Sequence, residues 1–167
     1  SLLITGGYSE STGGGGIYNG GGMLTVRSAI VSENSVVGNQ ARGGGICSIS
    51  GALVLEDVAI SRNTAIGQNG SGGGIYNASG SLTLLSVSVS GNAASTRGGG
   101  ILNDSGTLSL SQGEVNRNSS SSGGGICNSG TFLLTNSTIH GNSASYGAEV
   151  LSAGTMTVAN AAITGHE

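Results

Sequence analysis

GGGI, at residues 14–17, is the first of five copies in this chain of 167 residues, and the others lie at 43–46, 72–75, 98–101 and 123–126. A sixth, altered copy reads GAEV at 147–150. The last residues of successive copies are 29, 29, 26, 25 and 24 positions apart. A self-similar period in this range is typical of a repeat architecture, in which each copy forms one unit that stacks on the next.

A second pattern accompanies every copy at a fixed spacing. Each repeat holds a short apolar segment that ends at Val26, Leu55, Leu84, Leu110, Leu134 or Val158. Eight residues later comes a polar residue, namely Asn34, Asn63, Asn92, Asn118, Asn142 and finally His166. Insertions fall only in the loop before each glycine run and in the turn after each Ile-containing segment. The constant part of the repeat is therefore expected to be regular structure, and the variable parts are expected to be loops.

The repeat predicts three short strands per coil. In the third repeat these are 74–77, 82–84 and 89–92, and alternation of apolar and polar residues, as in Leu82-Thr83-Leu84, is typical of strands. Gly, Asn and Ser between them suit tight turns. No segment offers room for a crossover helix. We therefore predict an all-β fold, a right-handed single-stranded parallel β-helix of about six coils in one domain, 1–167, with about 4.8 Å between coils.

Composition excludes several classes of function. Charged residues make up 8% of the chain, the net charge is −3, and the five arginines are scattered, so a nucleic-acid partner is not expected. No apolar run approaches the roughly 18 residues of a membrane span. No Lys follows a GGG run, which argues against a phosphate-binding loop. The recurring Asp of calcium-binding repeats is also missing, so we expect no metal or cofactor.

The two ends of the chain lie in the same phase of the repeat. Residues 2–6 (LLITG) match residues 161–165 (AAITG), and both segments are predicted to be third strands. Neither end shows a capping helix, although solenoids normally need caps. The sequence therefore predicts a fragment of a longer solenoid or, alternatively, subunits that stack end to end. The first residue is Ser1 and not Met, which suggests a mature or excised segment.

The combination of GGGI with a later [VI]xxN, as at 31–34, 60–63 and 139–142, resembles known repeats. It is similar to the GGA[ILV] and FxxN repeats of polymorphic outer-membrane proteins and autotransporter passengers, and to GGGIYN-type β-helix repeats of large bacterial surface proteins. The resemblance covers nearly the whole chain. It implies export to the cell surface or the extracellular space, and a non-catalytic structural or adhesive role. The partner would be an unknown surface ligand, or copies of the chain joined end to end into a fibre.

The outward positions of the predicted second strands form a candidate binding face. Twelve positions are involved, and four of them carry Met23, Ala52, Val54 and Leu133. The other eight carry hydroxyl groups: Thr25, Ser81, Thr83, Thr107, Ser109, Thr131, Thr155 and Thr157. Regular ranks of Thr on a β-solenoid order water in some ice-binding proteins, so ice binding is one alternative function. Ser and Thr are also ordinary residues at exposed strand positions.

Two further columns have structural interpretations. Asn34, Asn63, Asn92, Asn118 and Asn142 are expected to stack as a hydrogen-bonded ladder, as are the asparagines after each first strand (Asn19, Asn77, Asn103 and Asn128). Cys47 and Cys127 occupy equivalent positions three coils apart, or roughly 14 Å. A disulfide needs Cα atoms about 5.5 Å apart, so these two cysteines are not expected to pair.

A second alternative function is that of a β-helix polysaccharide lyase or hydrolase. Such an enzyme would need two or three carboxylates on one face. Only Glu56 and Asp57 adjoin, and strand alternation predicts that they point to opposite faces. A contact of Arg27 with one of them would be a surface ion pair. We therefore predict no catalytic residues and a chain that is not an enzyme.

Overall fold

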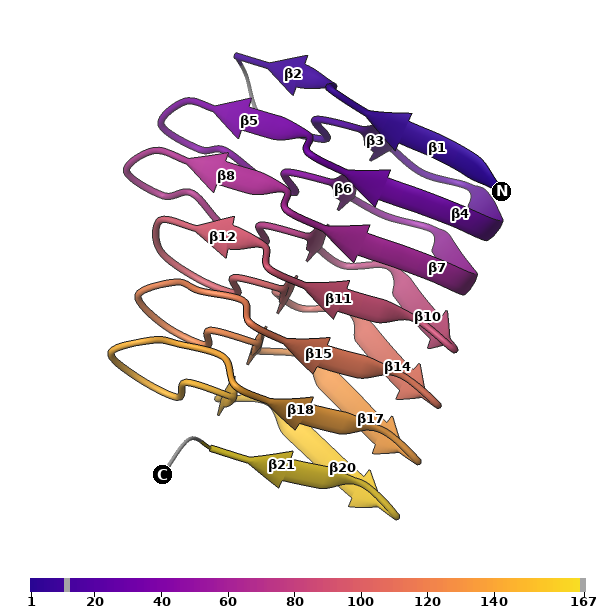
Figure 1. Cartoon of the computed structure of the whole chain (residues 1–167), viewed down its shortest axis with the longest axis vertical. Helices are drawn as coiled ribbons and strands as arrows, with labels where there is room; N and C mark the ends of the chain where they lie inside the picture. The colour runs from indigo at the N-terminus through magenta and orange to yellow at the C-terminus, as the bar shows by residue number, and fades with distance from the viewer. Residues whose placement is uncertain (11–12, 166–167) are drawn as a thin grey trace.

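The computed structural model describes residues 1–10 and 13–165, and in these residues every regular element is a β-strand. The strands wind into a parallel β-helix of about six coils. The chain crosses the near face from right to left and returns behind it while descending, so the coil is right-handed (Figure 1). The predicted fold class is confirmed. His166, the last predicted member of the Asn column, lies outside the described residues.

The predicted first strands build a six-stranded parallel sheet. Its members are β3 (Ile17–Asn19), β6 (Ile46–Ser48), β9 (Ile75–Asn77), β13 (Ile101–Asn103), β16 (Ile126–Asn128) and β19 (Val150–Ser152). The register pairs Ile17, Ile46, Ile75, Ile101, Ile126 and Val150 in one file. One GGGI copy therefore corresponds to one coil.

The predicted second and third strands lie together in an eleven-stranded sheet. In two coils they are continuous, as β4 (Met23–Ser32) and β7 (Ala52–Ser61). In the later coils they separate into β10 (Ser81–Leu85) and β11 (Ser88–Ser90), β14 (Thr107–Ser111) and β15 (Glu114–Asn116), β17 (Thr131–Thr135) and β18 (Thr138–His140), and β20 (Thr155–Ala159) and β21 (Ala162–Thr164). The first strand, β1 (Leu2–Thr5), pairs with the second half of β4, so it is a third strand, as predicted.

A further small sheet was not predicted from the sequence. It consists of β2 (Tyr8–Ser9), β5 (Ser35–Val37), β8 (Thr64–Ile66) and β12 (Ala93–Ala94), directly after the Asn column. Single bridges from Ala93 to Ser119 and on to Ser143 continue it. These strands of two or three mostly small residues carry too little alternation to be recognised.

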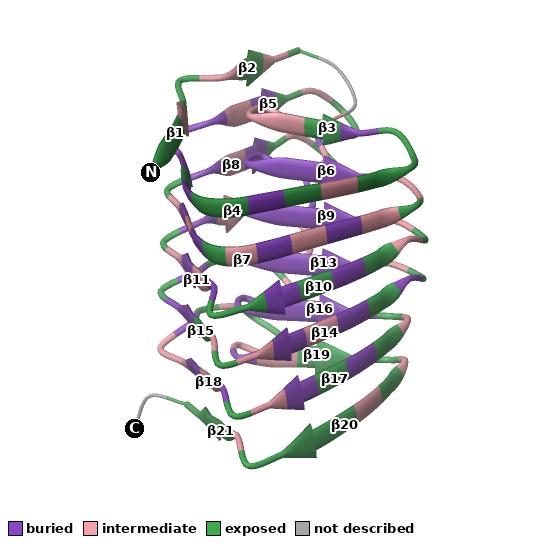
Figure 2. Ribbon diagram, turned by 90° about the vertical axis from the view of Figure 1, so that its right-hand side faces the viewer, coloured by how far each residue is buried: buried purple, intermediate pink, exposed green. Residues whose placement is uncertain are grey.

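The core is thin and aliphatic. One cluster fills the inside of the coils with Ile, Leu and Val, and Phe132 is its single aromatic residue. Figure 2 shows buried and more exposed residues alternating along β10, β14 and β17. A second cluster consists of the residues that directly follow the aligned isoleucines in the six-stranded sheet, namely Cys47, Tyr76, Leu102 and Cys127. Each coil contributes only a few large side chains to this thin core. The core can therefore be filled although the sequence contains few aromatic residues.

Two corners of each coil adopt positive φ without always using glycine. The corner between the second and third strands carries Ser28, Asp57, Ser86, Gln112, Asn136 and Asn160, with φ between 49° and 54°. The corner immediately before the Asn ladder carries Glu33, Arg62, Gly91, Arg117 and Gly141. Gly, Asn and Ser are the residues expected at such turns, but charged residues also occupy them. Their side chains are exposed there, so the cost is confined to the backbone.

Candidate functional site

The outward positions of the candidate binding face align in two columns across β4, β7, β10, β14, β17 and β20, which lie at the front of Figure 2. One column aligns Met23, Ala52, Ser81, Thr107, Thr131 and Thr155. The other aligns Thr25, Val54, Thr83, Ser109, Leu133 and Thr157. The structure therefore brings all eight predicted hydroxyl residues together, and we call these eight the hydroxyl face.

The side chains of the hydroxyl face are available to a ligand. Seven of the eight are exposed and Ser109 is half-buried. Within the described residues, none of the eight hydroxyl groups hydrogen-bonds to another protein group. The next outward position of the same strands adds Ser111 and Thr135, both half-buried, which were not among the predicted residues. The same alternation of outward polar and inward apolar residues, continued by two residues along the strand, would have predicted both.

The Asn ladder has a structural role, as predicted. The backbone N and the Nδ2 of each Asn donate to Oδ1 of the Asn in the next coil, over 2.9–3.0 Å. Each Nδ2 also donates to the carbonyl of a residue in the preceding coil, as Asn92 does to Ile60 over 3.0 Å. These side chains are buried, so they satisfy one another and are not open to a ligand.

Glu149 closes this ladder, which the sequence did not reveal. It occupies the third position of GAEV, where other repeats carry glycine, and it is 8% exposed. Asn142 Nδ2 donates to Glu149 Oε2 over 2.6 Å, and the Asn142 backbone N–H points at the same carboxylate. The carboxylate therefore takes the place of the next amide oxygen. The only available signal was an acidic residue at a position otherwise reserved for glycine.

The glycine runs serve contact between coils. The backbone N–H groups of Gly43, Gly44 and Gly45 donate to carbonyl groups of the next coil over 3.0–3.1 Å. The same pattern recurs at the later runs. Because these donors are used within the solenoid, they do not form a cradle for phosphate.

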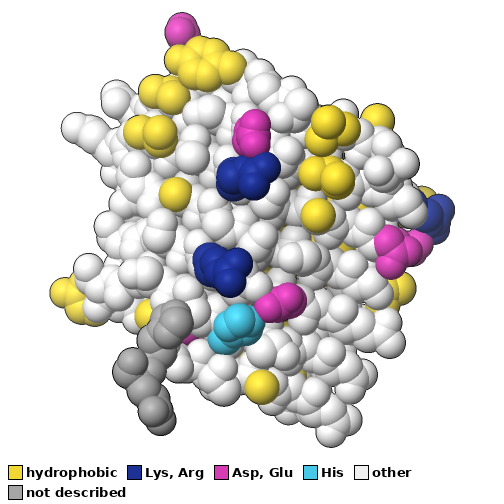
Figure 3. Space-filling view, viewed as in Figure 1, with side chains coloured by type: hydrophobic (Ala, Val, Ile, Leu, Met, Phe, Trp, Pro, Cys, Tyr) yellow, Lys and Arg dark blue, Asp and Glu magenta, His cyan; other side chains and the backbone are white. Residues whose placement is uncertain are grey.

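Several acidic side chains engage basic side chains. Arg27 pairs with Glu56, and this contact lowers the pKa of Glu56. Further pairs join Arg62 to Glu33 over 2.8 Å and His140 to Glu114 over 2.7 Å. The prediction for Arg27 is confirmed at Glu56. Figure 3 shows the charged side chains of one face as a few small groups separated by uncharged surface.

Asp57 departs from the strand geometry used to predict its direction. Its φ of 54° is far from the extended conformation, so the alternation argument that placed Glu56 and Asp57 on opposite faces does not apply to it. Asp57 is exposed, and Glu56 beside it is half-buried and bound by Arg27. The two carboxylates therefore lie in different environments.

Cys47 and Cys127 do not pair with each other, as the spacing predicted, and both are free in the structure. The register places Tyr76 and Leu102 between Cys47 and Cys127, so three coil steps separate the two thiols. Burial raises the pKa of Cys47 to about 11 and also raises that of Cys127. Since the thiolate is the nucleophile, protonated and buried thiols are inert at neutral pH.

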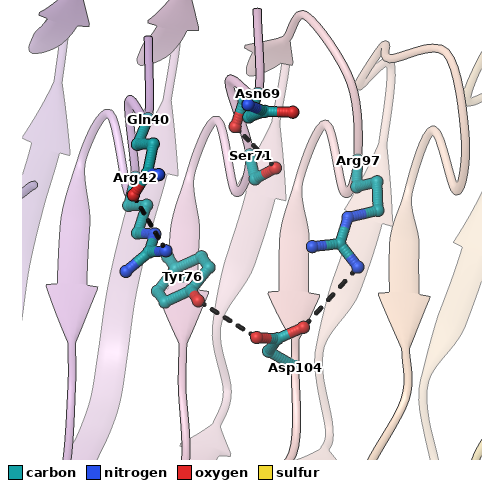
Figure 4. Close-up of a pocket in the computed structure, with 7 residues that line it drawn as sticks. All are labelled: Gln40, Arg42, Asn69, Ser71, Tyr76, Arg97 and Asp104. Atoms are coloured by element: carbon teal, nitrogen blue, oxygen red, sulfur yellow. Dashed lines mark hydrogen bonds and ion pairs between the residues drawn. The ribbon is translucent and has the colours of Figure 1, made fainter. Parts of the chain in front are cut away.

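A small pocket beside β9 was not predicted. It brings Arg42, Tyr76, Arg97 and Asp104 together from three successive coils (Figure 4). Its polar residues come from the loops of variable length before the glycine runs and from the turn after β13. Those are the parts of the repeat without periodicity, so no sequence signal joined them.

Comparison of the chain with protein-family models, with curated proteins and with solved structures found no match. Among the described residues, no helix has the length and apolar character needed to cross a membrane. The same residues contain no group of three or more His, Cys, Asp or Glu side chains placed to share a metal ion.

Proposed function

We propose that this chain is a non-catalytic, surface-displayed segment of a β-solenoid that binds an extended, neutral polar polymer such as a polysaccharide through its hydroxyl face. The observation that carries the proposal is the hydroxyl face itself, two columns of exposed hydroxyl groups without internal partners. All twelve positions of the two columns are uncharged. Such a surface matches a ligand that offers hydroxyl groups and ring oxygens rather than charges.

The interruptions in the columns support the same kind of partner. Met23 is 79% exposed and Leu133 is 41% exposed, so both offer apolar contact beside the hydroxyl groups. Sugar rings present C–H groups as well as hydroxyl groups, and they can use both kinds of contact. Glu33, Glu56 and Glu114 are each engaged by a basic side chain, which makes these three poor candidates for an acid–base pair and supports a binding role.

The backbone supplies a rigid support for this face. Continuous parallel ladders and the buried Asn ladder fix each coil against its neighbours. A face built on regular strands keeps its hydroxyl groups about 4.8 Å apart along the axis without a cofactor. A rod of this kind suits an adhesive or fibre-forming role outside the cell.

Pull-down with insoluble neutral polysaccharides, such as cellulose, chitin and β-1,3-glucan, tests the proposal. We expect the full chain to be depleted from solution by at least one of them. A double change, Thr107→Asp with Thr131→Asp, should weaken this binding at least tenfold, because an uncharged polymer would have to strip water from two carboxylates without offering them a charge partner. The matched control is Gln68→Asp, at an exposed loop position away from the hydroxyl face, and it should bind as the unaltered chain does. Lack of binding to every polymer, or an equal loss in the control, would refute the proposal.

A second candidate is ice binding, and one observation favours it. Along β10, β14, β17 and β20, seven of the eight positions in the two columns are Ser or Thr, with Leu133 as the exception. Thermal hysteresis of the unaltered chain that disappears in the Thr107→Tyr, Thr131→Tyr variant would identify this function instead. Absence of hysteresis would leave polymer binding as the role of the face.

A further inference from the structure

The pocket beside β9 has a volume of about 170 Å³ and lies on the six-stranded sheet, not on the hydroxyl face. Backbone bridges align Arg42 with Ser71 and Ser71 with Arg97. The two arginines are therefore two coil steps, or about 10 Å, apart along the axis. Both line the pocket, with Ser71 between them.

Asp104 is held at one side of the pocket by two donors. The Tyr76 hydroxyl donates to Asp104 Oδ2 over 3.2 Å, and Arg97 approaches Asp104 Oδ1 at 3.6 Å (Figure 4). Burial, together with the charge of Asp104, raises the pKa of Tyr76, so its hydroxyl stays protonated and remains a donor. The contact between Arg97 and Asp104 is long and leaves most of the guanidinium donors of Arg97 unused.

Arg42 has no carboxylate partner among the described residues. Its guanidinium lies 5.2 Å from the centre of the Tyr76 ring, and one of its nitrogens donates to Gln40 Oε1 over 3.4 Å. Tyr76 is only 3% exposed. Its ring therefore packs against the Arg42 guanidinium and does not offer a stacking surface to a ligand. Two guanidinium groups against one carboxylate leave the pocket with a net charge of +1.

We propose that this pocket binds a hexuronate, a sugar residue that carries one carboxylate. Guanidinium groups bind carboxylates through paired hydrogen bonds, and Arg42 is the arginine of this pocket without a carboxylate partner in the described part of the chain. The single excess positive charge matches a monoanion better than a doubly charged phosphate. Side chains of Gln40 and Asn69 at the rim offer amides for sugar hydroxyl groups. The volume lies below the roughly 300–1,000 Å³ of pockets for drug-sized ligands, which favours a ligand no larger than one sugar residue.

The site goes beyond the proposed role of the hydroxyl face, which takes a neutral polymer. The two ligand classes differ in charge, and the two sites lie on different sheets. An acidic sugar bound at the pocket would therefore add a second contact, one that depends on charge, to the contact made by the hydroxyl face. The acidic sugar can belong to the target that carries the neutral polymer or to a different target.

Titration of the full chain with sodium D-glucuronate, followed through the side-chain Nε–H signals of arginine in NMR spectra, tests the inference. We expect saturable shifts at Arg42 and Arg97 in the millimolar range. D-glucose should cause no shift, and sodium acetate, which has the carboxylate without the sugar, should bind at least tenfold more weakly. Glucose 6-phosphate should also bind more weakly than glucuronate.

Arg42→Gln should weaken glucuronate binding at least tenfold, and Arg117→Gln, an exposed arginine elsewhere, should leave it unchanged. If Arg42→Gln fails to fold, Arg42→Lys keeps a cation over Tyr76 but loses the planar fork, and it should still weaken binding severalfold. The Thr107→Asp, Thr131→Asp variant should bind glucuronate normally, so failure of one proposal is distinguishable from failure of the other. No saturable shift, acetate binding as tightly as glucuronate, or unaltered binding by the Arg42 variants would overturn the inference.

Discussion

Replacement of Gly73 by alanine is expected to lower the free energy of unfolding by about 3 kcal/mol or more. A Cβ atom at Gly73 would lie 2.4 Å from the carbonyl oxygens of both Ala93 and Gly99. These atoms belong to the backbone of the next coil, so they can withdraw only if the hydrogen-bonded ladder between the coils opens. Urea unfolding of the purified chain, followed by circular dichroism, measures the effect.

Gly91→Ala is the matched control for this prediction. Its Cβ would meet only the Arg62 side chain, at 3.9 Å, so space is sufficient. The φ of Gly91 is 63°, which costs a residue with a Cβ roughly 1–2 kcal/mol. Equal destabilisation by the two changes would contradict the claim that Gly73 is needed for the close approach of the coils.

Asn92→Ala is expected to cost about 3 kcal/mol or more as well, because it interrupts the buried ladder. The backbone N and the Nδ2 of Asn63 both donate to Asn92 Oδ1 over 2.9 Å. Asn92 Nδ2 in turn donates to the carbonyl of Ile60. Alanine removes these partners without admitting water, and each buried polar group left unpaired costs about 1–3 kcal/mol. The same urea experiment measures the loss.

Asn39→Ala serves as the control for the ladder, because Asn39 is exposed in a loop. Surface changes of this kind usually alter stability by less than about 0.5 kcal/mol. A comparably small effect of Asn92→Ala would show that the amide ladder does not hold successive coils together.

The sequence was sufficient to predict the fold because the solenoid repeats one register. Successive coils pair residue with residue, so an insertion inside a strand would shift every later pair. The constant eight residues between Leu55 and Asn63, or between Leu110 and Asn118, reflect this requirement. The alternation within β10 and β14 likewise predicted which residues face outward, and hence the hydroxyl face.

The remaining features have physical reasons for escaping prediction. The small sheet of β5 and β8 is held by backbone bonds and leaves little trace in side chains. The carboxylate of Glu149 acts as an acceptor only because the coil brings it against Asn142. The pocket joins Arg42 and Asp104 from loops and turns of unequal length, where counting along the chain gives no register.

Methyl–methyl NOEs in a sample labelled at isoleucine Cδ1 test most directly whether each repeat closes one turn and bonds to the turns beside it. Stacked coils predict cross-peaks that join Ile46 to Ile75, Ile75 to Ile101 and Ile101 to Ile126, in the order of the aligned file. They predict none between Ile46 and Ile126, which lie three coil steps apart. Missing neighbour cross-peaks, or a direct one between Ile46 and Ile126, would contradict the β-solenoid and the binding faces built on it.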